Sequence, residues 1–213
     1  DLRNQGKNVT LSFFPEYWLF QKRKNLFPLS GVSNIDTILC SDEGKHQIFK
    51  SDKYGFRNDN DVWNKETVDY LIVGDSFAQG FCVNDSDHIS SHINRITNKN
   101  VINLAYGSNG PLIEFASIRE YLPKNTKNLL WFYFEGNDLD NLNMELKNSF
   151  LKEYLINNEF SQNLKDKQNK IDKKITLELE KNLSFQNTIS KFLKLSKTRK
   201  IYVNLLKKKQ KNY

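Results

Sequence analysis

Three short segments of the chain contain residue types that could support a nucleophilic serine. They are residues 74–77 (Gly-Asp-Ser-Phe), 107–110 (Gly-Ser-Asn-Gly) and 136–138 (Gly-Asn-Asp), and each follows or ends an apolar run. A serine at the turn between a strand and a helix is exposed and lies near a helix N-terminus, which favours a nucleophile whose attack creates negative charge. A glycine-rich loop offers an unobstructed N–H group and an asparagine offers its amide, so the three segments together could form an oxyanion hole.

The elements that must position these segments follow an alternating pattern. Apolar runs at residues 68–74, 100–107 and 128–134 predict three strands, and residues 87–97 and the segment that begins at Pro111 have helical character. Strands that alternate with helices indicate parallel pairing, and continuous apolar runs are typical of strands covered on both faces. We therefore predict an α/β fold in which the three segments meet at the carboxyl edge of a parallel sheet.

In this order, the segments resemble the blocks of the SGNH (GDSL) hydrolase superfamily, which contain a Ser nucleophile, a Gly, an Asn and a late His. Residues 74–80 (Gly-Asp-Ser-Phe-Ala-Gln-Gly) match the first block, and residues 136–138 match the third. The resemblance covers roughly residues 30–140. It implies a three-layer, flavodoxin-like parallel sheet in which Ser76 is the nucleophile.

The same resemblance implies which groups hold the oxyanion. The donors would be the N–H groups of Ser76 and Gly107 and the side chain of Asn137. The match to the second block is looser, so the family glycine could also correspond to the position of Ser108.

Residues 51–58 (Ser-Asp-Lys-Tyr-Gly-Phe-Arg-Asn) and the run that leads to Ser76 resemble a bacterial subgroup associated with surface-polysaccharide gene clusters. This implies a serine esterase or O-acyl transferase that acts on an O-acylated carbohydrate or another small ester. Water would complete an esterase cycle, whereas a sugar hydroxyl would make the protein a transferase. The resemblance also suggests the cell envelope or another extracytoplasmic location, with a membrane anchor that could lie outside the given chain. No cofactor, metal or nucleic-acid partner is expected.

The sequence lacks a general base at the place where the family has one. In the family a histidine follows the third block, whereas no histidine follows Asp138 in this chain. Because the loss of a triad member costs several orders of magnitude in rate, we expect the chain as given to be nearly inactive and truncated at its C-terminus.

The alternative is a non-catalytic SGNH-like binding or scaffold domain. His46 could serve as the base from a position upstream of the serine. His88 and His92 are one helical turn apart and could pair on a metal, although we favour the interpretation that they lie on a helix face.

Composition divides the chain into three parts. All nine Gly and all four Pro lie at or before Gly136, and residues 161–213 hold 15 Lys/Arg against 4 Asp/Glu, so the net charge of +7 arises from the C-terminal part. We expect an extended lead-in over residues 1–67 that packs on the core, an SGNH-type α/β core over 68–140 and a basic helical arm or insertion over 141–213. Such an arm could bind anionic partners, but solvated helix faces are the favoured interpretation.

Several side chains have a structural interpretation. Residues 131–134 (Trp-Phe-Tyr-Phe) are expected to be core, and Asp75 and Asp138 to be acceptors that order their loops. Cys40 and Cys82 have no metal-ligand spacing and cannot form a disulfide scaffold, so we interpret them as small buried hydrophobes and leave the redox compartment open. A content of 38% hydrophobic residues excludes wholesale disorder, and no apolar run approaches the length of a membrane span.

Overall fold

The computed structural model describes residues 7–21, 25–42 and 45–193, with side chains as far as residue 184 except that of Asp42. The chain divides into two compact units, with the boundary between Ile175 and Thr176. The three predicted loops all lie in the first unit.

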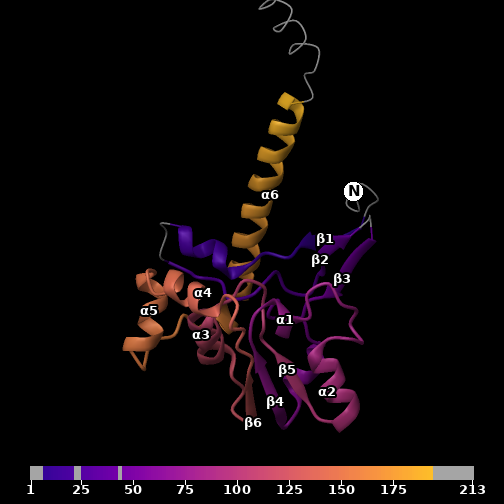
Figure 1. Ribbon diagram of the computed structural model, residues 1–213, viewed down its shortest axis with the longest axis vertical. Coiled ribbons are helices and arrows are strands. Elements are labelled where there is room, and N and C mark those ends of the chain that lie inside the picture. Colours follow the sequence, from indigo (N-terminus) through magenta and orange to yellow (C-terminus); the bar gives the residue numbers. More distant parts are fainter. Residues whose placement is uncertain (1–6, 22–24, 43–44, 194–213) are drawn as a thin grey trace, which may run out of the picture. The chain divides into compact units, whose positions relative to one another are not determined.

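A three-stranded parallel sheet forms the centre of the first unit (Figure 1). Strand β4 (Val68–Val73) lies between β5 (Val101–Asn103) and β6 (Thr126–Trp131), and both pairings are parallel. Because β4 has a neighbour on each side and is covered on both faces, Leu71 and Ile72 have no exposed surface. The predicted α/β class with a parallel sheet is confirmed.

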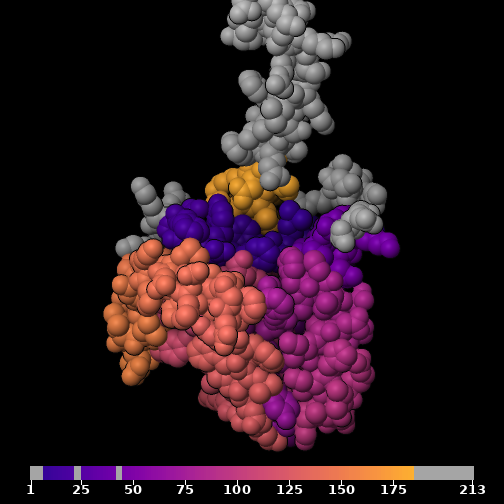
Figure 2. All heavy atoms as spheres, in the orientation of Figure 1, coloured from indigo at the N-terminus to yellow at the C-terminus, as the bar shows by residue number. Residues whose placement is uncertain are grey.

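Helices follow each strand of this sheet, as the sequence pattern predicts. They are α1 (Ser76–Gln79) and α2 (Ile89–Thr97) after β4, α3 (Pro111–Tyr121) after β5, and α4 (Asp138–Glu145) and α5 (Ser149–Ile156) after β6. Pro111 is the first residue of α3, where a missing N–H removes no intrahelical hydrogen bond. The magenta segment that contains α2 and the orange segments of α4 and α5 lie on opposite sides of the face seen in Figure 2.

The residues that follow α4 belong to the same compact unit as the sheet. Leu151 and Tyr154 of α5 are fully buried. The buried carboxylate of Glu120, near the end of α3, accepts hydrogen bonds from Tyr154 Oη at 2.6 Å and from the N–H of Leu164 at 2.9 Å. The compact unit therefore extends to Ile175, beyond residue 140, where we expected the core to end.

The last described elements are a short 3₁₀ helix, η3 (Leu164–Lys167), and helix α6 (Gln168–Leu193). Their helical conformation agrees with the periodicity of the apolar residues in this part of the chain. None of the described helices is both long and apolar enough to cross a membrane.

A second three-stranded sheet lies in the first 67 residues, where the sequence suggested only an extended lead-in. Strands β1 (Val9–Leu11), β2 (Asp36–Asp42) and β3 (Lys45–Lys50) pair in that order, the first pair parallel and the second antiparallel. Two 3₁₀ helices, η1 (Pro15–Phe20) and η2 (Asn60–Asn64), complete this region.

The turn at residues 51–58 joins the two sheets. The buried carboxylate of Asp52 accepts hydrogen bonds from the N–H of Phe56 at 2.9 Å and from Asn58 Nδ2 at 2.8 Å. Asn58 also pairs with Asn103 at the end of β5, because its Nδ2 donates to the Asn103 carbonyl at 3.0 Å and its Oδ1 accepts from the Asn103 N–H at 2.7 Å. The first region of the chain therefore contacts the carboxyl end of the central sheet.

The interpretation of the two cysteines as small buried hydrophobes is wrong. Cys40 of β2 and Cys82, which follows α1, form a disulfide with a Cα–Cα distance of 5.6 Å. Cys40 is half-buried and Cys82 is exposed. Their separation of 42 residues in the sequence gave no sign of this pairing, which depends on how the first sheet lies against the loop after α1.

The expectation that residues 131–134 form core is also wrong. Trp131, Phe132, Tyr133 and Phe134 are 43%, 38%, 50% and 42% exposed. A continuous apolar run indicates that both faces of a strand are apolar, but burial also needs neighbouring elements beyond it. Among the described residues, β6 pairs only with β4, so it lies at the edge of the sheet.

Candidate functional site

Ser76 occupies the turn between β4 and α1. It is half-buried and is the first residue of α1, and its hydroxyl makes no hydrogen bond within the described part of the chain. Gly74 makes the turn possible, because its φ of 154° and its surroundings both exclude a side chain. A Cβ at Gly74 would lie 2.7 Å from Ala78 Cβ and 3.1 Å from Phe132 Cβ.

Two acidic side chains order the loops on either side of the site, as the sequence predicted. Asp75 Oδ1 accepts a hydrogen bond from the Phe77 N–H at 2.8 Å and thereby caps α1. Asp138 Oδ2 accepts from the Phe134 N–H at 2.6 Å. Both carboxylates are buried, and burial raises the pKa of Asp138, with a further contribution from the charge of Asp75.

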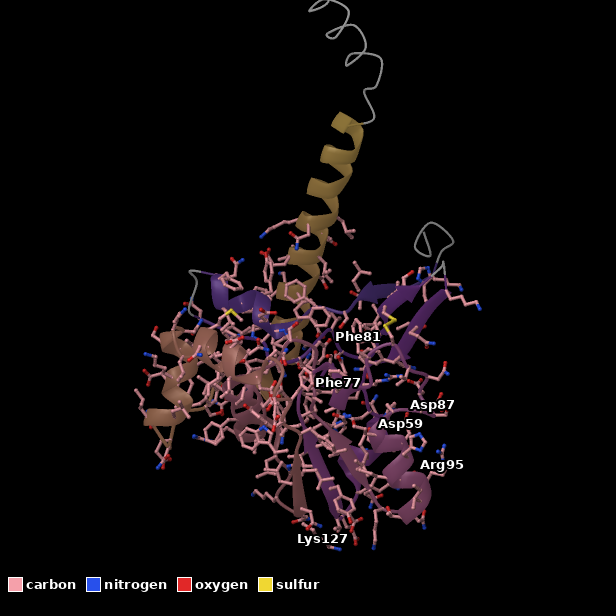
Figure 3. All side chains as sticks on the ribbon, in the orientation of Figure 1. Asp59, Phe77, Phe81, Asp87, Arg95 and Lys127 are labelled. Carbon is pink, nitrogen blue, oxygen red and sulfur yellow. A yellow bond between two sulfur atoms is a disulfide. The ribbon has the colours of Figure 1, made fainter. Side chains whose placement is uncertain are left out.

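The structure brings the three predicted loops to one edge of the sheet. The Tyr106 N–H donates to the Gly74 carbonyl at 3.2 Å, which joins the second loop to the first. The rings of Phe77 and Phe134 lie 4.8 Å apart and join the first loop to the third. Figure 3 labels Phe77 near the start of α1 and Lys127 at the opposite end of the sheet.

The second loop does not present the N–H that we expected. The Gly107 N–H donates to Gln79 Oε1 at 2.9 Å in a buried hydrogen bond. The next residue, Ser108, has a left-handed backbone with φ of 61°, a conformation that glycine adopts most easily. Its N–H makes no hydrogen bond to the described residues, whereas those of Gly107, Asn109 and Gly110 do, so the free backbone donor of residues 107–110 belongs to Ser108.

Asn137, in the third loop, precedes helix α4, and its side chain lacks hydrogen-bond partners among the described residues. It is the N-cap residue of α4, yet its side chain does not cap the helix. Its Oδ1 atom is buried and has no hydrogen-bond partner in the described structure. Its amide is thus not committed to a structural role and is available to a bound group.

A cluster of buried carboxyls lies behind the three loops, and sequence reasoning missed it. Glu114 of α3 is buried, which raises its pKa to about 8, and Asp138 and Glu145 add to the shift. Trp131 Nε1 donates to one carboxyl oxygen of Glu114, and the other is buried without a partner. Because a residue such as Glu114 is common in exposed helices, its burial has no signal in the sequence.

Glu145 of α4 has a different role in this cluster. Its carboxyl accepts hydrogen bonds from the N–H groups of Gly110 at 2.7 Å and Leu112 at 2.8 Å, and so it caps α3 from outside the helix. Burial raises the pKa of Glu145 to about 7, although these hydrogen bonds oppose the shift. Helices α3 and α4 are thereby joined through one side chain.

Arg57 fixes the loop after α1 and was not identified from the sequence as a positioning residue. Its buried guanidinium donates to the carbonyls of Gly80 at 2.7 Å and Val83 at 2.9 Å. It also pairs with Asp85 at 2.6 Å. Together with the disulfide at Cys82, these contacts hold residues 80–85 of the loop.

The three histidines lie outside the candidate site. His46 is exposed on β3. His88 is the buried N-cap residue of α2 and contacts Ser90 Oγ through Nδ1 at 2.8 Å. His92 accepts a hydrogen bond from Arg95. In the part of the chain that the structure describes, no histidine bonds to Ser76 and no group of three or more His, Cys, Asp or Glu side chains could hold a metal ion.

No protein-family model, curated protein or solved structure matches the chain. The interpretation of the site therefore depends on its own geometry and on the order of its loops.

Proposed function

We propose that the protein is a serine esterase or O-acyl transferase of the SGNH type, with an O-acylated carbohydrate as its substrate class. The observation that carries the proposal is the placement of Ser76 at a glycine turn where three polar loops converge, with a hydroxyl that makes no hydrogen bond to the described residues. The parallel sheet that ends at this turn is compatible with the three-layer arrangement of that superfamily.

In the proposed reaction, Ser76 Oγ attacks the carbonyl carbon of the ester. The ester C–O bond breaks, the alcohol leaves with a proton, and the acyl group stays on the serine. Water then releases it as a carboxylic acid, or a sugar hydroxyl takes it to form a new ester.

The oxyanion that forms during attack needs donors aimed at it. The Ser76 N–H and the Asn137 Nδ2 group, which makes no hydrogen bond to the described residues, supply two donors. The Ser108 N–H supplies the third in place of Gly107, because the Gly107 N–H already bonds to Gln79.

A non-catalytic binding or scaffold domain is the second candidate. It is favoured by one observation, the lack of a histidine hydrogen-bonded to Ser76 among the described residues. A serine without a base is a poor nucleophile at neutral pH.

The disulfide bears on the cellular location. Disulfides persist in oxidising compartments and are rare in the cytosol. The pairing of Cys40 with Cys82 supports the proposed extracytoplasmic location.

The test is ester hydrolysis by the full-length protein and its Ser76→Ala variant, with 4-nitrophenyl acetate and an O-acetylated polysaccharide as substrates. We expect Ser76→Ala to lower kcat/KM by about a thousandfold or more. Ser149→Ala is the matched control, since Ser149 is also a serine at the first position of a helix, α5, and is exposed. Equal activity of the two variants would favour the non-catalytic domain.

A further inference from the structure

A concave site lies apart from the three loops. It is a cavity of about 700 Å³ between the segment at residues 57–65, the end of β3 and helix α2. Its volume is within the range of small-molecule sites. None of the loops at Ser76, Gly107 or Asn137 lines it. Figure 3 labels Asp59 on this side of the molecule, together with Asp87 and Arg95 from the region of α2.

The charges on the cavity wall cancel. The wall carries three cationic and three anionic side chains, namely Lys50, Arg57, Lys65, Asp59, Asp61 and Asp85. The wall also includes His88, which is neutral at pH 7 because burial and the charge of Arg57 lower its pKa to about 4. A wall with no net charge gives no electrostatic preference for an anionic or a cationic ligand.

The wall nevertheless has many polar atoms without partners. The Nδ2 groups of Asn94 and Asn100 donate to backbone carbonyls at 2.8 and 3.0 Å, so the Oδ1 atom of each amide is left as an open acceptor. Asp59 and Asp61 are exposed, and their carboxylates make no hydrogen bond or ion pair within the described part of the chain. The two lysines of the wall are also exposed and without partners there.

We propose that this cavity binds a neutral saccharide unit. Sugar hydroxyls donate to carboxylate and amide oxygens and accept from ammonium groups, so one kind of chemical group satisfies every open atom on the wall. An apolar ligand would remove water from these atoms without replacing its hydrogen bonds. A charged ligand of either sign would meet three side chains of its own charge as well as three of the opposite charge. The inference goes beyond the proposed esterase, since it would hold equally for a non-catalytic glycan-binding domain.

The experiment is titration of the ¹⁵N-labelled protein, monitored by its backbone amide NMR signals. The probes are the methyl glycosides of glucose, galactose, mannose and N-acetylglucosamine, with glucose 6-phosphate as the anionic probe. We expect at least one neutral glycoside to shift the signals of Asp61, Asn94 and Asn100 with a Kd of about 1 mM. We expect the Asp59→Ala and Asp61→Ala variants to bind it at least about tenfold more weakly.

Glu159→Ala is the control, because Glu159 is an exposed acidic residue outside the cavity and its loss should leave the Kd unchanged. Both aspartates are exposed, so the variants should keep the wild-type dispersion of amide signals. The proposal is overturned if no neutral glycoside shifts these signals at concentrations up to about 20 mM. It is also overturned if glucose 6-phosphate binds more tightly than methyl glucoside, or if the amide signals that shift are those of Ser76 and its neighbours and not those of the cavity. Because these outcomes concern binding, they are independent of whether Ser76→Ala abolishes ester hydrolysis.

Discussion

The loop that follows β4 and the segment that follows β6 meet at the same edge of the sheet, but the protein holds them in different ways. The first is tied by the Asp75 cap, the Gln79 bond to Gly107, the guanidinium of Arg57 and a disulfide. The second leaves three aromatic residues exposed, at positions 132–134, and the Oδ1 atoms of Asn137 and Asp138 are buried without partners among the described residues.

This difference concerns how each half of the candidate site is held in place. A buried polar atom without a partner costs about 1 to 3 kcal/mol, so such atoms are few in stable proteins and often mark a place where another group binds. The nucleophile side also has exposed aromatic residues, Phe77 and Phe81, and the Nε2 atom of Gln79 is buried there without a partner in the described structure. The two sides differ because only the first is tied by a disulfide and by the guanidinium of Arg57. Substitutions on the two sides should therefore differ in the size of their effects.

The largest effect is expected on the nucleophile side, from Arg57→Ala. Removal of the buried guanidinium leaves the carbonyls of Gly80 and Val83 without their donor. We expect the free energy of unfolding to fall by about 3 to 5 kcal/mol, measured by urea denaturation. Arg95→Ala is the control, because Arg95 is exposed on α2, and its loss should change the value by less than about 1 kcal/mol. Similar losses for the two variants would mean that Arg57 does not hold the loop.

The disulfide should contribute the next largest effect. It joins cysteines separated by 42 residues, and we expect the Cys40→Ser, Cys82→Ser double variant to lose about 2 to 4 kcal/mol of stability. Reduction of the wild-type protein should give a similar loss, and reduction of the double variant should give none. If thermal unfolding in the presence and absence of reductant gives the same midpoint for the wild type, the pairing is absent in solution.

The pH dependence tests the buried carboxyls behind the β6 side. Burial raises the pKa of Glu114 from 4.5 to about 8, so the folded state holds this proton more tightly than the unfolded state. The contribution of Glu114 to the free energy of unfolding is therefore fully present below about pH 4.5. It is lost as the pH rises toward 8, at roughly 1 kcal/mol per pH unit. We expect Glu114→Gln to reduce this slope between pH 5 and pH 8, measured by chemical denaturation, with Glu66→Gln, an exposed glutamate, as the control. An unchanged slope would mean that the Glu114 carboxyl is exposed to solvent in the folded protein and that its pKa is not raised.

The smallest effect is expected at the edge strand. Leu129 of β6 is 43% exposed, whereas Ile72 of β4 is fully buried. Leu129→Ala should cost less than about 1 kcal/mol and Ile72→Ala about 2 to 5 kcal/mol. Equal costs would indicate that β6 is covered in solution and that the contrast between the two sides is smaller than the structure suggests.

The sequence predicted the elements of the central sheet because their signals are local. Apolar runs, the proline at the start of α3 and the turns at Gly74 and Gly136 depend on neighbouring residues alone. The roles of Asp75 and Asp138 were also predicted correctly, since each bonds to an N–H within four residues of itself.

The features that the sequence did not predict all depend on residues that are distant along the chain. The Cys40–Cys82 bond needs the first sheet to lie beside the loop after α1. The Gly107 N–H was expected to be free, but it donates a hydrogen bond to Gln79, 28 residues away. The aromatic residues 131–134 are exposed because no described element lies beyond β6, and an apolar run cannot specify such a neighbour. The roles of Arg57 and Glu114 depend on which residues pack around them.

The central claim is that Ser76 is a nucleophile, and the most direct measurement is the mass of peptides from the full-length protein after reaction with a fluorophosphonate. We expect a single phosphonylated peptide, the one that contains Ser76, and no adduct after denaturation of the protein before labelling. Adducts on several serines at similar yield, or none on Ser76, would contradict the claim and leave the glycan-binding domain as the better description.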